Sequence, residues 1–200
     1  MIEKKESKIK DIIIDGISKS FQDKKVFSNF SGKIVSGITN CFFGPSGSGK
    51  TTLIRILLNL DTVDDGKILN IDQLKKSVVF QEDRLCENLS SLINVKMVMD
   101  SNVDNFLATQ LLIELGLEEN INQKVAELSG GMKRRVAIAR ALASEYDLLI
   151  LDEPFKGLDN KTREETIKIV KRQSLGKTVV LVTHDLKEAE LLDTKNYIYF

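Results

Sequence analysis

The chain has 200 residues, 42% of them hydrophobic, which is enough to build one domain around a substantial core. Its 29 basic and 29 acidic residues cancel, so no overall field favours a nucleic-acid partner. No apolar run approaches the roughly 18 residues of a membrane span, and the N-terminus lacks the apolar core of a signal peptide. We therefore expect a cytoplasmic protein, in which Cys41 and Cys86 are reduced thiols without metal-site spacing.

The chain opens with a charged segment, residues 3–8, and an isoleucine-rich segment, residues 9–14. The isoleucine pattern predicts the first strand of a small antiparallel β-lobe that reaches to about residue 43. Residues 38–43, Ile-Thr-Asn-Cys-Phe-Phe, are predicted to form a buried strand. From there, alternating strand and helix patterns predict a mostly parallel sheet and therefore the α/β class.

Residues 44–52 read Gly-Pro-Ser-Gly-Ser-Gly-Lys-Thr-Thr and lie between this strand and a predicted helix at 52–60. Glycines allow tight turns that aim backbone N–H groups inward, and the helix adds the positive end of its dipole. The loop is therefore a candidate cradle for a polyphosphate, with a plain Gly/Ser-rich turn as the alternative. Lys50 would reach the β- and γ-phosphates, and the Thr51 hydroxyl would bind Mg²⁺. The predicted nucleotide-binding residues are Gly44, Pro45, Ser46, Gly47, Ser48, Gly49, Lys50, Thr51 and Thr52.

Two carboxylates follow the apolar run at 148–151, which predicts a central strand buried on both faces. The carboxyl edge of such a strand lies beside the phosphate loop. There Asp152 would hold Mg²⁺, and Glu153 would act as the general base that polarises the attacking water. Two solvated acids at a strand end are the alternative. Pro154 stops the strand at this point.

Two further polar residues end predicted strands of the same sheet. Residues 164–173 predict a helix that leads to an apolar strand at 179–182, and His184, the only histidine of the chain, follows this strand. Gln81 follows the strand at 77–80, where its amide oxygen would complete the Mg²⁺ shell; a polar residue that caps the strand is the alternative. Both candidates therefore join the two acids at the carboxyl edge.

The segment between Gln81 and residue 128 has a helical pattern. Apolar residues recur at helix spacing at positions 106, 111, 112 and 115, and Gly116 is a natural C-cap. Residues 128–132, Leu-Ser-Gly-Gly-Met, then open a predicted helix that runs to about residue 144. A serine and two glycines at a helix N-terminus form a second candidate anion site, with a plain helix cap as the alternative. One nucleotide cannot use both anion sites of one subunit, because the helical segment separates them.

The sequence resembles the ATP-binding cassette (ABC) family, the motor subunits of membrane transporters, nearly from end to end. The matching segments, in the family's order, are residues 44–52, Gln81, residues 128–132, residues 148–154, the turn at 157–159, and His184. The resemblance implies an α/β P-loop NTPase fold of the ABC type, with a mostly parallel central sheet, a small antiparallel β-lobe and an inserted helical lobe. The implied single ATPase domain, 1–200, comprises the β-lobe with the first core strand (1–43), a RecA-like core (44–81 and 128–200) and a helical lobe (82–127), with no C-terminal regulatory domain.

The resemblance also implies roles for the residues at the carboxyl edge. Glu153, His184 and Gln81 are the implied catalytic residues. His184 would contact the γ-phosphate and keep Glu153 and the water aligned, while Gln81 would be the hinge that senses the transport channel. The implied Mg²⁺ ligands are Thr51, Gln81 and Asp152.

A head-to-tail dimer that holds two ATP molecules between its protomers is implied as well. Ser129, Gly130 and Gly131 of one protomer would close on the γ-phosphate held by the other. The residues expected at this dimer interface are Leu128, Ser129, Gly130, Gly131 and Asp159. In the family, an aromatic ring normally stacks on adenine, and Phe21 is the residue expected to do so here. Phe27 is a second candidate. Either ring could instead belong to the hydrophobic core.

The implied function is ATP hydrolysis on the inner face of a cell membrane, with an identical or related cassette, permease subunits and an extracytoplasmic substrate-binding protein as partners. Residues 80–85 and 152–159 look most like importer ATPases for nitrate, sulfonate and taurine, although 86–88 read Cys-Glu-Asn where relatives have Leu-Pro-Trp. An ATPase of an exporter or lipoprotein-release complex, or a soluble non-transport ABC ATPase, is the alternative. We expect Gln81 and residues 82–106 to grip the membrane subunit, with Asp83 and Arg84 exposed.

Overall fold

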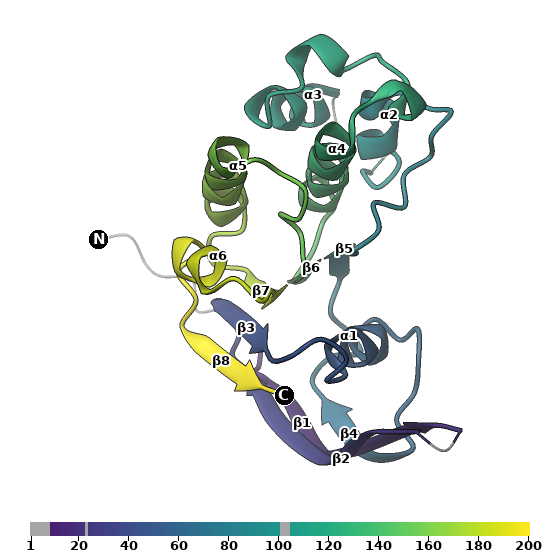
Figure 1. Cartoon of the computed structure of the whole chain (residues 1–200), viewed down its shortest axis with the longest axis vertical. Helices are drawn as coiled ribbons and strands as arrows, with labels where there is room; N and C mark the ends of the chain where they lie inside the picture. The colour runs from purple at the N-terminus through teal and green to yellow at the C-terminus, as the bar shows by residue number, and fades with distance from the viewer. Residues whose placement is uncertain (1–8, 23, 101–104) are drawn as a thin grey trace.

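The structure is a computed structural model that describes residues 9–22, 24–100 and 105–200. The charged segment at residues 3–8 lies outside these ranges. The described residues form a five-stranded sheet, a smaller three-stranded sheet and a group of helices (Figure 1). None of the helices within the described ranges has the length and apolar character that a bilayer crossing requires.

Strands and helices alternate along most of the chain. The strands are β1 (Ile12–Phe21), β2 (Lys24–Ile34), β3 (Thr39–Phe43), β4 (Asp65–Leu69), β5 (Lys76–Val79), β6 (Leu148–Asp152), β7 (Thr178–Val182) and β8 (Asn196–Tyr199). The helices are α1 (Lys50–Leu57), α2 (Ser91–Lys96), α3 (Asn105–Glu114), α4 (Gly130–Ala143), α5 (Asn160–Gln173) and α6 (Leu186–Leu191), with two short 3₁₀ helices, η1 (Glu118–Asn120) and η2 (Val125–Glu127).

The larger sheet is parallel, with the strand order β5-β6-β7-β3-β8. Every residue of β6 and β7 is buried, as their uninterrupted apolar runs predict for strands covered on both faces. Because parallel strands end at a common edge, the phosphate loop after β3 and the polar residues at the ends of β5, β6 and β7 lie along the same side of the sheet. The predicted α/β fold, a mostly parallel sheet with a small antiparallel lobe, is confirmed.

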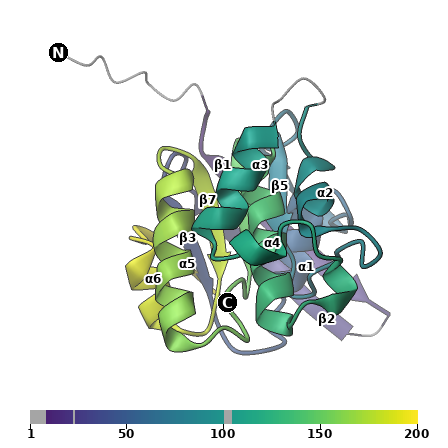
Figure 2. The ribbon, with the colours of Figure 1, turned by 90° about the horizontal axis from the view of Figure 1, so that it is seen from above.

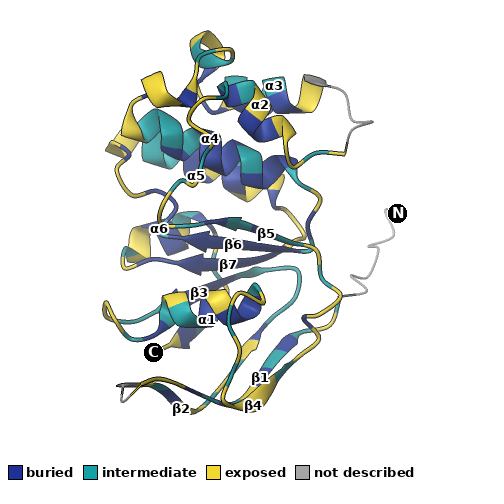
Figure 3. Ribbon diagram, turned by 90° about the vertical axis from the view of Figure 1, so that its right-hand side faces the viewer, coloured by how far each residue is buried: buried dark blue, intermediate teal, exposed yellow. Residues whose placement is uncertain are grey.

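The smaller sheet is antiparallel, with the order β2-β1-β4. Its buried residues, such as Ile14, share a core with α1 and with Leu148 and Ile150 of β6. The alternate residues of β6, Leu149 and Leu151, belong to a second core with the other helices. Figure 3 shows the result: the parallel sheet lies between α1 and the small sheet on one side and α2–α5 on the other.

On the helical side of the sheet, α2 and α3 pack on α4, and α6 lies beside α5 (Figure 2). Several boundaries differ from the predicted ones. β1 begins at residue 12 and runs on to 21, and α1 ends at Leu57 because the chain turns at Asn59, whose φ is 58°. α5 begins at Asn160 because Asp159 caps it by accepting two backbone N–H groups. The division of the chain into lobes at residues 43, 81 and 127 stays a prediction.

Candidate active site

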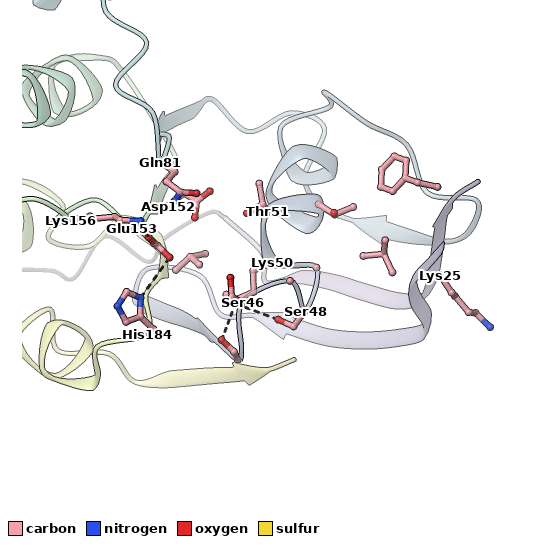
Figure 4. A pocket seen from close by; sticks show the side chains of 17 residues that line it. Lys25, Ser46, Ser48, Lys50, Thr51, Gln81, Asp152, Glu153, Lys156 and His184 are labelled. Atoms are coloured by element: carbon pink, nitrogen blue, oxygen red, sulfur yellow. Dashed lines mark hydrogen bonds and ion pairs between the residues drawn. The ribbon is translucent and has the colours of Figure 1, made fainter. Parts of the chain in front are cut away.

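A cavity of about 700 Å³ opens at the carboxyl edge of the parallel sheet, between the phosphate loop and the ends of β6 and β7 (Figure 4). Its wall contains residues from segments that are far apart in the sequence. The predicted site residues that line it are Phe21, Gly44, Ser46, Gly47, Ser48, Gly49, Lys50, Thr51, Thr52, Gln81, Asp152, Glu153 and His184. The structure therefore brings together the motifs that the sequence places on separate strands.

The phosphate loop has a conformation that depends on its glycines. Gly49 has a φ of 102°, and a Cβ there would lie 2.6 Å from a ring carbon of Phe27 in β2. Lys50, the first residue of α1, folds back over the loop. Its Nζ donates to the carbonyl oxygens of Gly44 (2.9 Å) and Pro45 (2.7 Å). The loop therefore holds a positive charge inside the cavity.

Asp152, the last residue of β6, is only 3% exposed. Burial raises its pKa to about 6, the neighbouring Glu153 carboxylate adds to the shift, and the charges of Lys50 and Arg134 oppose it. The Thr51 hydroxyl and the amide of Gln81 line the same cavity. Hydroxyl, amide and carboxylate oxygens are the ligands that Mg²⁺ prefers, so the residues present fit a divalent cation that arrives with a nucleotide.

Glu153 turns out of the strand with a φ of 45°, which is uncommon for a residue other than glycine. Its N–H donates to the carbonyl of Val182 (2.9 Å), so the turn is fixed against β7. Its Oε1 lies 3.6 Å from Nδ1 of His184, and its Oε2 lies 3.2 Å from Nζ of Lys156 (Figure 4). His184 itself is exposed at the cavity. A carboxylate held in this way on the cavity wall can accept a proton from a water molecule.

Phe21 and Phe27 lie in different environments. Phe21, at the end of β1, is 46% exposed and lines the cavity, with Nζ of Lys19 5.1 Å from the centre of its ring. Phe27 is 4% exposed and packs against the rings of Phe30 and Phe200. Of the two rings, Phe21 is the one with a face available to a planar ligand.

The signature residues lie away from this cavity. Ser129 caps α4, accepting the N–H of Met132 at 3.4 Å, and both Ser129 and Gly130 are exposed. Leu128 is instead 6% exposed and packs in the core shared with the helices, and its place at a dimer interface stays a prediction. Asp159, the cap of α5, is exposed.

The expectation that Asp83 is exposed is wrong. Its side chain is 26% exposed, and its Oδ1 lies 3.3 Å from Nε of Arg134 on α4. Burial raises the pKa of Asp83, and the charge of Arg134 opposes this shift. Arg84 does agree with the expectation: it is about half exposed, and its guanidinium lies 3.9 Å from the centre of the Phe80 ring.

Two lysines that the motifs do not predict also line the cavity. Lys156 follows Glu153 by three residues, and the turn after β6 brings the two side chains together. That spacing is a signal that sequence reasoning overlooked. Lys25 of β2 lies at the far end of the cavity from Glu153 and His184 (Figure 4), and no local pattern marks it.

A parallel sheet with a phosphate loop, a strand-end acid pair and an adjacent histidine defines a nucleoside triphosphatase of the phosphate-loop class. The family profile described as "ABC transporter" matches residues 27–156. The aliphatic sulfonates import ATP-binding protein SsuB of Delftia acidovorans is 39% identical over 90% of this chain and 75% of its own length. The taurine import ATP-binding protein TauB of Pseudomonas aeruginosa is 38% identical, with the same coverage of 90% and 75%.

A solved structure of an ABC transporter cassette is similar to this chain along nearly its whole length. The dimeric MJ0796, a bacterial ABC transporter cassette, has a TM-score of 0.83 at 32% identity, over 94% of each chain. The chain therefore belongs to the ABC transporter family, and the predicted resemblance is confirmed. It is an ATP-binding, ATP-hydrolysing subunit of an ABC transporter.

Proposed function

We propose that this ATPase drives the import of a small molecule or ion, and that it works as a head-to-tail pair of cassettes. One observation carries the pairing. The phosphate loop, Asp152 and Glu153 share one cavity, while residues 129–131 stand outside it at an exposed helix end. A second cassette that turns its signature toward this cavity would complete the anion site. The dimeric MJ0796 cassette supports such a pair.

The cavity residues would bind the nucleotide in the following way. Lys50 would exchange its carbonyl partners for phosphate oxygens, which are stronger acceptors because they are charged. Phe21 would stack on the adenine. Thr51, Asp152 and Gln81 would hold Mg²⁺, which when bound supplies positive charge to the β- and γ-phosphate oxygens.

Hydrolysis would then depend on Glu153 and His184. Glu153 accepts a proton from the water that attacks the γ-phosphorus, and the bond from that phosphorus to the departing ADP oxygen breaks. His184, 3.6 Å from Oε1 of Glu153, contacts the γ-phosphate and keeps the carboxylate in line with the water. Asp159, exposed at the start of α5, would meet the second cassette.

The direction of transport rests on the names of the relatives. SsuB is named for the import of aliphatic sulfonates and TauB for that of taurine. PotA of Thermotoga maritima, 37% identical and matched over 53% of its length, is named for the import of spermidine and putrescine. An exporter role has weaker support, because the ATP-bound Atm1-family exporter shares the fold (TM-score 0.87) at only 20% identity. We therefore place the chain on the inner face of the membrane, with permease subunits and an outer substrate-binding protein.

Pairing predicts a change of mass on ATP binding. Glu153→Gln, which slows hydrolysis, should double its mass under saturating Mg-ATP and remain monomeric without nucleotide, because ATP supplies most of the interface contacts. Light scattering measures this. Ser129→Glu in the same background should stay monomeric, since a carboxylate at that position would repel the γ-phosphate. A monomer of Glu153→Gln under saturating ATP would contradict the pairing.

The proposal also places the membrane subunit against the segment that begins at Gln81. In the described part of that segment, Met97 and Val98 join Leu107 of α3 around a hollow of about 760 Å³, and all three side chains are exposed. A short cytoplasmic helix with an apolar face would fit such a hollow. Arg84, whose side chain is about half exposed, lies on the segment that connects this hollow to the ATP cavity.

Arg84→Glu should therefore lower transport by roughly tenfold in the assembled transporter, because reversing an exposed interface charge creates repulsion at the contact. ATP affinity of the isolated chain should be unchanged. Transport into proteoliposomes and an equilibrium ATP titration give the two values. Lys168→Glu, an exposed reversal on α5, is the matched control. Full transport by Arg84→Glu would place the contact elsewhere.

A further inference from the structure

The chain after β5 leaves the sheet, and its backbone is held by a helix instead. Arg134 of α4 donates through Nη1 to the carbonyl oxygen of Phe80 (2.6 Å) and through Nη2 to that of Gln81. Its Nε lies 3.3 Å from Oδ1 of Asp83. The guanidinium therefore contacts three residues of one short segment, which its planar fork of donors makes possible.

Arg134 is 5% exposed, so these contacts are made away from water. A buried guanidinium is costly unless its donors are satisfied, and loss of one partner leaves the others uncompensated. Arg134 and the backbone from Phe80 to Asp83 therefore hold one another in place. The backbone of Gln81, which lines the ATP cavity, is fixed by this contact rather than by a strand.

A second arginine of the same helix continues the contact. Arg140 donates to the carbonyl oxygens of Asp83 (3.0 Å) and Arg84 (2.8 Å). Arg135, by contrast, points to the other side of α4 and donates to the carbonyls of Leu115 (2.7 Å) and Gly116 (3.0 Å). Arg134 and Arg140 therefore hold the segment that leads from the ATP cavity, whereas Arg135 holds the end of α3.

Arg134 lies close to the signature residues along α4. The helix begins at Gly130, directly after the signature Ser129, and Arg134 lies about one turn further along. At about 1.5 Å per residue the signature and the Gln81 contact are separated by roughly 7.5 Å of rigid helix. A displacement of the helix N-terminus must therefore displace the backbone of Gln81.

We propose that Arg134 is a positioning residue that fixes Gln81 to α4, so that Gln81 reaches its place in the ATP cavity only when the signature end of the same helix is in its own place. The proposal rests on the proposed role of Gln81 in ATP hydrolysis. It adds to that role the side chain through which the signature helix and the Gln81 backbone move together.

The first test uses the chain without nucleotide. A nitroxide attached to Glu82→Cys in a Cys86→Ser background reports the mobility of this segment, because Glu82 is exposed between the residues that Arg134 contacts. Cys41 is buried and does not compete for the label. Arg134→Met keeps the length of the side chain but removes its donors, so label mobility should rise clearly. Arg135→Met, which removes an arginine of α4 that contacts Leu115 and Gly116 instead of this segment, should leave the label mobility unchanged. Unchanged mobility in a folded Arg134→Met chain would overturn the proposal.

The second test separates positioning from general stability. In the assembled transporter, Arg134→Met should lower kcat by roughly tenfold or more with little change in KM for ATP, because buried charge-assisted contacts are lost. In a Gln81→Ala background the same substitution should add less than about twofold, since Arg134 acts through Gln81. Additive losses in the two variants would instead show a merely structural role for Arg134.

Arg134→Lys keeps the positive charge but not the fork, and it covers the case in which Arg134→Met does not fold. It should raise label mobility and lower kcat as well, because one ammonium cannot reach both carbonyls and Asp83. Wild-type mobility and kcat in Arg134→Lys would overturn the proposal. The label does not depend on ATP, so failure of the proposed function, seen as a wild-type chain that binds no ATP, is distinguishable from failure of this inference.

Discussion

Glu153→Gln is expected to reduce ATP turnover by roughly 10²–10⁴-fold, the loss that follows removal of a general base. The amide keeps the size and shape of the carboxylate and so preserves the positive-φ turn that ends β6. It cannot take a proton from water. Because Lys50 and Thr51 are untouched, ATP should bind as before, and steady-state turnover of the assembled transporter beside an ATP titration would give both quantities.

The matched control for this substitution is Glu165→Gln, the same chemical change at an exposed position of α5. We expect turnover in that variant to equal the wild-type value. Near wild-type turnover in Glu153→Gln would remove Glu153 from the mechanism and leave Asp152 as the acid to examine next.

Lys50→Ala should lower ATP affinity by roughly 10- to 100-fold, the effect of losing a hydrogen bond to a charged group inside a cavity. Lys50 already lies within hydrogen-bonding distance of the Gly44 and Pro45 carbonyls, so the charge is present before the nucleotide arrives. The substitution removes that charge and also the two hydrogen bonds that hold the loop. Titration with a fluorescent ATP analogue measures the change in Kd.

Lys25→Ala provides the comparison, because Lys25 lines the same cavity at the end remote from Glu153 (Figure 4). Its removal changes the net charge of the cavity equally but leaves the phosphate loop intact. We expect a weakening of affinity well below that of Lys50→Ala. Equal losses in the two variants would mean that Lys50 acts through bulk charge and not through a direct phosphate contact.

Much of this site was predictable because its residues lie where strands end. The apolar runs of β6 and β7 mark central strands, and parallel strands place their last residues at one edge, so Asp152, Glu153 and His184 were expected to meet. The phosphate loop was predictable for a similar reason, since its glycines connect a strand to a helix. Local pattern and shared topology were sufficient for these residues.

Contacts between distant segments were not predictable in this way. The burial of Asp83 depends on Arg134, which no periodicity or spacing in residues 80–84 indicates. The same is true of Phe21 and Phe27, two aromatic residues of one hairpin. Phe27 is buried because it packs against Gly49 of the phosphate loop and the rings of Phe30 and Phe200, whereas Phe21 is exposed. The start of α5 was misplaced because its first turn is polar and only the Asp159 cap marks it.

Successive residues of β6 belong to two different cores, and this arrangement affects how the sequence of such a protein can diverge. Leu148 and Ile150 belong to the core shared with α1 and the small sheet, whereas Leu149 and Leu151 belong to the core shared with the other helices. A change of side-chain volume among the helices therefore meets β6 on one face only, and the contact of Arg134 with residues 80–83 is the route by which it reaches the ATP cavity. Substitutions that leave this contact intact can reshape the surface offered to a different membrane partner while the ATP cavity keeps its geometry, so specificity for a partner and the ability to hydrolyse ATP can evolve separately in this chain.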